Sequence, residues 1–174
     1  MEKKNILITG RKNVGKSILV KRVIEQFHGY AGFKTVPLKN YGLISTYDFI
    51  NKTSIPISKY VDNKIVGIPE SFSTFGKKCL KNALDSNYSL VIMDELGRFE
   101  RTSHDFLYYV DEILNSDKIV IAVIKAEKID YLEKIKNRKD CYLYDLDEVS
   151  FEKAYQEIIF RLNILLTWEG DKID

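Results

Sequence analysis

The stretch that decides the fold is Gly10-Arg11-Lys12-Asn13-Val14-Gly15-Lys16-Ser17, which matches the pattern GxxxxGK[ST] at every fixed position. It follows a short apolar run, Asn5–Thr9, and precedes Val20, Val23 and Phe27, which have helical spacing. In a strand–turn–helix unit of this kind, backbone N–H groups of the turn surround phosphate oxygens, and the helix N-terminus adds the positive end of its dipole. The stretch therefore predicts a triphosphate-binding loop.

The predicted nucleotide site consists of this loop and the next helical residue. Its members are Gly10, Arg11, Lys12, Asn13, Val14, Gly15, Lys16, Ser17 and Ile18. We expect Lys16 to reach the β- and γ-phosphates and the Ser17 hydroxyl to bind Mg²⁺. The alternative, a glycine turn followed by a chance Lys-Ser pair, is disfavoured by the strand before the motif and the helix after it.

A second acidic motif follows an apolar run at residues 90–93, where Asp94 and Glu95 come in succession. This is the form of a Walker B element, in which the first carboxylate holds Mg²⁺ and the second polarises the attacking water. Carboxylates at the carboxyl end of a strand face the crevice where α/β proteins bind ligands. We therefore predict Asp94 as a metal ligand, together with Ser17, and Glu95 as a catalytic residue. An ordinary loop start with solvated carboxylates is the alternative.

Strand-like and helix-like segments alternate along the rest of the chain. Apolar runs predict further buried strands at residues 118–124 and 141–146. Helical patterns follow Ser71, Ser103 and Ser150, with Ser71 expected as an N-cap, and a weaker pattern covers residues 129–135. This alternation predicts an α/β protein with a three-layer P-loop NTPase fold and a mostly parallel central sheet.

Residues 32–68 interrupt the alternation with prolines and glycines. We expect an irregular β-rich excursion on the sheet edge, with short strands at 41–47 and 64–68, because this segment is too short for a core of its own. The chain is accordingly predicted to form a single domain at residues 1–168, followed by a polar tail at 169–174.

Composition excludes several classes of protein. The net charge is only +2, from 27 basic and 25 acidic residues, so charge gives no argument for a nucleic-acid partner or a membrane surface. The two cysteines, Cys79 and Cys141, are isolated and predict reduced thiols. The first apolar run is too short for a signal peptide or a membrane span. We expect a cytoplasmic protein whose partner is a nucleoside triphosphate.

The run Asp94-Glu95-Leu96-Gly97-Arg98-Phe99-Glu100 resembles the DE[IL]GxxE segment of the thermophilic-type nucleoside-triphosphatase family, which includes the cancer-related nucleoside-triphosphatase. Residues 8–10 and 13–17 resemble its ITGxPGVGK[TS] motif, and residues 32–35 and 135–140 resemble its GFxT and I-[RK]-x-R-x-D segments. The resemblance runs from about residue 5 to 145. It departs from the family pattern at Lys12-Asn13, where the family has Pro-Gly, and at Asp147-Glu148-Val149, where the family has Glu-Asn-Arg.

The resemblance implies slow hydrolysis of several nucleoside triphosphates to diphosphate and phosphate, with little base selectivity. Together with the motifs it predicts a Mg²⁺-dependent nucleoside-triphosphatase in which Lys16 and Glu95 are catalytic. We expect Arg98 to stabilise charge on the γ-phosphoryl oxygens, with Arg101 and Arg138 as weaker candidates for this role.

Two other functions stay open at this point. In a small-molecule kinase on the same scaffold, Glu95 would deprotonate an acceptor hydroxyl and residues 38–66 would form a lid over that acceptor. In a nucleotide-binding adaptor or switch, turnover would be small and a protein partner would matter more. Lys125 and Glu127 follow a strand in the manner of the base-reading loop of GTPases, but only the lysine matches that motif, so the sequence favours a solvated loop there. A strong base preference would implicate these two residues first.

Overall fold

A seven-stranded sheet forms the centre of the molecule in the computed structural model, which describes residues 3–38 and 43–170. The strand order is β4-β3-β2-β7-β8-β1-β9. The strands are β1 (Asn5–Thr9), β2 (Ala31–Pro37), β3 (Ile44–Asp48), β4 (Ser54–Pro56), β7 (Leu90–Leu96), β8 (Ile119–Ile124) and β9 (Cys141–Asp145). Every pairing from β2 to β9 is parallel, whereas β3 and β4 are antiparallel. The predicted mostly parallel α/β sheet is confirmed.

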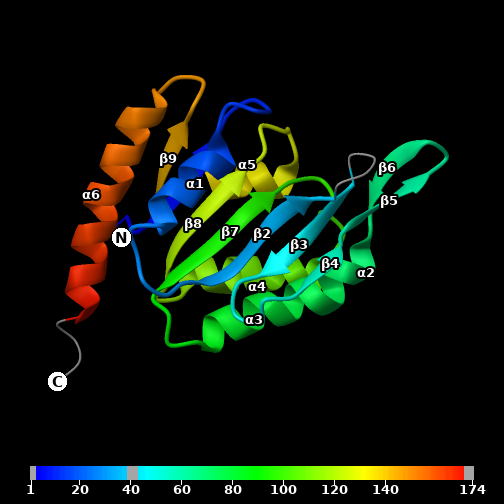
Figure 1. The fold of residues 1–174 in the computed structure, drawn as a ribbon, viewed down its shortest axis with the longest axis horizontal. Coiled ribbons are helices and arrows are strands. Elements are labelled where there is room, and N and C mark those ends of the chain that lie inside the picture. The colour runs from blue at the N-terminus through cyan, green and yellow to red at the C-terminus, as the bar shows by residue number, and fades with distance from the viewer. Residues whose placement is uncertain (1–2, 39–42, 171–174) are drawn as a thin grey trace.

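Helices cover both faces of this sheet and complete the three predicted layers (Figure 1). One face packs against α1 (Lys16–Ile24) and α6 (Phe151–Gly170), and the other against α3 (Lys77–Asp85), α4 (His104–Asn115) and α5 (Asp130–Lys136). Side chains alternate between the faces: Ile6 and Ile8 join the α1–α6 side, and Leu7 joins the other. Because both faces are buried, the strands read as continuous apolar runs.

The β-rich excursion lies at the sheet edge, as predicted, and most of it is regular. Thr46 in β3 pairs with Thr35 of β2 on one side and with Ile55 of β4 on the other, so these strands extend the central sheet. The strand expected at 41–47 begins at Ile44, and residues 41 and 42 lie outside the described residues. A separate hairpin of β5 (Ser58–Val61) and β6 (Lys64–Gly67) projects beyond the sheet, as Figure 1 shows.

Two helix boundaries differ from those the sequence indicated. The segment after β6 begins with the short helix α2 (Pro69–Ser71). It continues as a π-helical turn, η1 (Phe72–Gly76), and then becomes α3. The prediction of Ser71 as an N-cap is wrong: Pro69 takes the first helical position, which suits its fixed φ, and the Ser71 hydroxyl donates to the Pro56 carbonyl at 2.8 Å. At the other end of the chain, α6 runs to Gly170 and so enters the expected tail. Among the described residues, no helix is both long and apolar enough to cross a membrane.

The position of β8 shapes the edge of the sheet where a ligand would bind. β8 lies between β1, which leads into the phosphate loop, and β7, which ends at the acidic pair. Since all three strands are parallel, their carboxyl ends meet at one edge of the sheet. The loop that follows β8 therefore opens between the phosphate loop and the acidic pair.

Candidate active site

The phosphate loop connects β1 to α1 through backbone conformations that suit its sequence. Gly15 precedes the helix with φ 106°, a left-handed conformation that glycine adopts without steric cost, and Asn13 also has a positive φ of 64°. The Lys16 side chain is buried within the loop, and its ammonium donates to the Gly10 and Arg11 carbonyls at 2.8 Å each. The lysine thus lies against the loop backbone, where its predicted phosphate role requires it.

Ser17 and Asp94 meet at the edge of the sheet. The Ser17 hydroxyl donates to Asp94 Oδ1 at 3.0 Å, although the two residues lie on different elements. Burial raises the pKa of Asp94 to about 6, against the opposing effect of the hydrogen bond from Ser17. A hydroxyl and a carboxylate at this distance are hard oxygen ligands of the kind Mg²⁺ prefers. Larger groups of His, Cys, Asp and Glu suited to a metal are absent from the described residues, so phosphate oxygens and water would complete its coordination.

Glu95 lies beside this pair, and its carboxylate has a cationic neighbour. Lys125 Nζ, from the loop after β8, is 3.2 Å from Glu95 Oε1, and both side chains are mostly buried. Arg98 is 3.6 Å from Glu127 and lies over the Phe99 ring at 5.2 Å. The structure therefore brings Lys16, Ser17, Asp94 and Glu95 to one edge of the sheet, with Arg98 on the loop that follows β7.

Comparison with known proteins identifies the family. The family described as NTPase matches residues 5–159. This chain belongs to the NTPase family. Over 96% of the chain and 98% of the relative, it is 32% identical to "Nucleoside-triphosphatase THEP1" of Thermotoga sp. (strain RQ2). It is 24% identical to "Cancer-related nucleoside-triphosphatase homolog" of Mus musculus, over 90% of this chain and 95% of that one.

The fold of this NTPase-family chain also matches a solved structure. The crystal structure of THEP1 from Aquifex aeolicus superposes with a TM-score of 0.71 and 22% identity, over 86% of this chain and 95% of that one. The predicted fold class and the resemblance drawn from the motifs are thereby confirmed.

The sequence interpretation gave no role to a buried carboxylate next to the site. Glu100 Oε1 accepts hydrogen bonds from the Gly97 amide and, at 2.7 Å, from the Tyr131 hydroxyl of α5. Burial raises the pKa of Glu100 to about 7, and these hydrogen bonds partly oppose that rise. Glu100 thus fixes the loop that carries Arg98 to α5. The signal was present, since Glu100 is the last residue of the DE[IL]GxxE match.

A second residue to which the sequence interpretation gave no role contacts the phosphate loop of this NTPase-family chain. Asp147, on the loop after β9, accepts a hydrogen bond from the Arg11 amide at 2.7 Å, and its other oxygen is 3.5 Å from the Arg11 Nε. The Asp147 amide in turn donates to Asp145 at 2.9 Å. This segment is where the chain departs from the family's Glu-Asn-Arg pattern, and its first residue, Asp147, contacts the loop.

Of the two weaker arginine candidates, one lies far from the phosphate loop and the other is exposed at the surface. Arg138 pairs with Asp111 and Asp140 at the amino end of β9, which is the opposite end of the strands from the phosphate loop. This position is wrong for a residue that contacts the γ-phosphate. Arg101 is exposed in the turn before α4.

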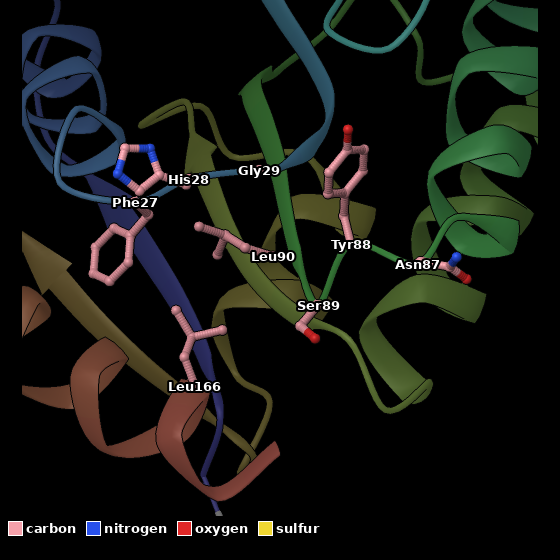
Figure 2. Close-up of a pocket in the computed structure, with 8 residues that line it drawn as sticks. All are labelled: Phe27, His28, Gly29, Asn87, Tyr88, Ser89, Leu90 and Leu166. Atoms are coloured by element: carbon pink, nitrogen blue, oxygen red, sulfur yellow. The ribbon is translucent and has the colours of Figure 1, made fainter. Parts of the chain in front are cut away.

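A pocket of about 280 Å³ also lies at that opposite end (Figure 2). It is formed by the segments that lead into β2 and β7, together with Leu166 of α6. Figure 2 labels its residues: Phe27, His28, Gly29, Asn87, Tyr88, Ser89, Leu90 and Leu166. Because Leu90 begins β7 and Glu95 comes near its end, this pocket is separate from the candidate active site.

Proposed function

We propose that this chain hydrolyses nucleoside 5'-triphosphates to diphosphate and phosphate with Mg²⁺ as cofactor. The observation that carries the proposal is the contact between Ser17 and Asp94 next to Glu95, at the edge of the sheet where the phosphate loop opens. The family membership and the names of the relatives, which are nucleoside-triphosphatases, support the same activity.

Each residue of the candidate site has its own role in the proposed reaction. The loop amides of residues 10–18 and the Lys16 ammonium bind the phosphates, and Ser17 and Asp94 would hold Mg²⁺, which would neutralise phosphate charge. Glu95 accepts a proton from the water whose oxygen bonds to the γ-phosphorus. The bond from that phosphorus to the β–γ bridging oxygen breaks, and the diphosphate leaves. Arg98, on the loop that follows β7, would stabilise negative charge on the γ-phosphoryl oxygens during transfer.

Neither alternative function has a specific observation in its favour. The kinase alternative needs residues 38–66 as a lid over an acceptor, yet β3 and β4 in this segment are paired into the central sheet. The adaptor alternative requires nucleotide binding with little turnover, and the rate of phosphate release tests this requirement. We also propose a cytoplasmic location, which is supported by Cys79 and Cys141 being buried free thiols.

The test is phosphate release from Mg·ATP with no acceptor present. We expect the wild-type chain to release phosphate and E95Q to do so about 10²–10⁴-fold more slowly, the usual range for a lost general base. Glu25, an exposed residue at the end of α1, provides the matched control E25Q, which should retain the parent rate. Tight nucleotide binding with no phosphate release by the wild-type chain would refute hydrolysis.

A further inference from the structure

The ion pair between Lys125 and Glu95 has no place in the function described so far. Lys125 Nζ lies 3.2 Å from Glu95 Oε1, and the exposed fractions of the two side chains are 29% and 21%. A partly buried pair of this kind is screened less by water than a surface salt bridge. The proposed water-activating carboxylate therefore has a fixed cationic partner.

The aliphatic part of Lys125 is held in place along its length. Its backbone amide donates to the Leu96 carbonyl at 2.9 Å, which anchors the start of the loop to β7. The stem then passes so close to Gly97 that a Cβ there would lie 2.7 Å from Lys125 Cδ. The ammonium lies 5.6 Å from the centre of the Phe99 ring, within the range of a cation–π contact. The side chain is thus directed into the site and is not a solvated surface lysine.

Strand order brings this ammonium to the edge of the sheet where the γ-phosphate of a bound triphosphate would lie. Because β8 lies between β1 and β7, Lys125 emerges between the phosphate loop and the Asp94–Glu95 pair. The contacts of Lys125 therefore fit neither a solvated loop nor a base-reading one. A lysine ammonium has three N–H donors, so contact with Glu95 leaves donors for a phosphate oxygen.

We propose that Lys125 binds a γ-phosphate oxygen while it positions the Glu95 carboxylate. The same ammonium would then couple recognition of the third phosphate to the orientation of the group that activates water. The inference rests on the proposed function for the role of Glu95, but phosphate recognition by Lys125 can be tested without any turnover.

Calorimetric titration with Mg²⁺ and either ADP or the non-hydrolysable β,γ-imido analogue of ATP separates recognition of the γ-phosphate from binding of the rest of the nucleotide. We expect K125M to bind the triphosphate analogue about tenfold or more weakly than the wild-type chain, because a charge-assisted hydrogen bond is lost. Affinity for ADP should change by less than about threefold, since ADP lacks the γ-phosphate. Lys128, an exposed residue of the same loop, gives the matched control K128M, which should bind both ligands normally. K125R, which keeps the charge, should restore part of the selectivity.

A double-variant cycle tests the shared ammonium. E95Q removes the charge that competes for Lys125, so it should tighten binding of the triphosphate analogue by about threefold or more, and this gain should vanish in E95Q/K125M. Equal weakening of both ligands by K125M and by K125Q, a milder substitution that retains hydrogen-bonding groups, would assign Lys125 a purely structural role and overturn the proposal. No effect on either ligand would overturn it as well. Failure of the proposed hydrolysis would appear separately, as absent phosphate release by a wild-type chain that still distinguishes the two ligands.

Discussion

The Ser17 hydroxyl donates to Asp94 Oδ1 at 3.0 Å, and this hydrogen bond joins the start of α1 to the end of β7 across the intervening strand β8. The serine begins the helix after the predicted phosphate loop and the aspartate lies near the end of β7, so the contact joins the two halves of the candidate site. Both oxygens are thus already close enough to serve one cation.

Replacing Asp94 with asparagine should raise the Mg²⁺ concentration needed for half-maximal phosphate release by about tenfold or more, because the amide can still accept from Ser17 but carries no charge. Burial disfavours the charged carboxylate, as its raised pKa shows, so free D94N should be at least as stable as the wild-type chain at pH 8. Phosphate release against Mg²⁺ concentration and thermal melts measure the two effects. D117N, at an exposed position, is the control. An unchanged Mg²⁺ requirement would remove Asp94 from the metal site.

Lys16→Ala should abolish most of the thermal stabilisation that Mg·ATP gives the chain. This stabilisation follows RT ln(1 + [L]/Kd), so lost affinity appears directly as a lost shift in Tm. The variant also leaves the Gly10 and Arg11 carbonyls without their ammonium donor, which should lower the Tm of the free protein modestly. Lys21, exposed on α1, supplies the control K21A. A K16A shift equal to that of the wild-type chain would disprove the phosphate-binding role.

The local motifs could be predicted because each depends on residues that are adjacent in the sequence. The phosphate loop is one uninterrupted segment whose strand, turn and helix lie next to each other in sequence, and Asp94 and Glu95 directly follow the strand that carries them. The apolar runs also identified the parallel strands, since burial on both faces leaves few polar positions.

Contacts that depend on strand order could not be predicted in this way. Alternating strands and helices are compatible with β8 on either side of β1, and only its place beside β7 brings Lys125 to Glu95. Burial of Glu100 likewise requires Tyr131 from a helix distant in sequence. The helix start at Ser71 was misplaced because its hydroxyl has a tertiary partner, the Pro56 carbonyl, that no local pattern reveals.

Glu100 should make stability depend on pH in a defined window. Its pKa is about 7 in the folded chain and about 4.3 in an unfolded one, so the folded state binds more protons between these values. Stability from this group is therefore lost as pH rises from about 4 to above 7. E100Q stays neutral and can still accept from Gly97 and Tyr131 through its carbonyl oxygen.

The stability of E100Q relative to the wild-type chain should accordingly improve by roughly 2–3 kcal/mol between pH 5 and pH 8, which is the part of the pKa shift that falls within this range. Urea unfolding at both pH values gives this difference, with E25Q as a control that should follow the wild-type chain. Parallel pH dependence of wild type and E100Q would mean that Glu100 titrates normally.

Base selectivity should be weak. The loop after β8 is engaged at the candidate active site, where Lys125 contacts Glu95 and Glu127 contacts Arg98, so these contacts direct neither side chain to a base. The exposed Ile18 side chain, next to Ser17, offers apolar contact, which does not distinguish one base edge from another. Values of kcat/KM for ATP, GTP, CTP and UTP under identical Mg²⁺ should therefore lie within about tenfold of each other.

A site that hydrogen-bonds one base discriminates far more strongly, because the wrong base leaves buried polar groups unpaired. A spread above roughly a thousandfold would thus reveal a dedicated base pocket. If K125A then reduced kcat for all four nucleotides alike, Lys125 would be excluded as the base-reading residue and retained at the γ-phosphate.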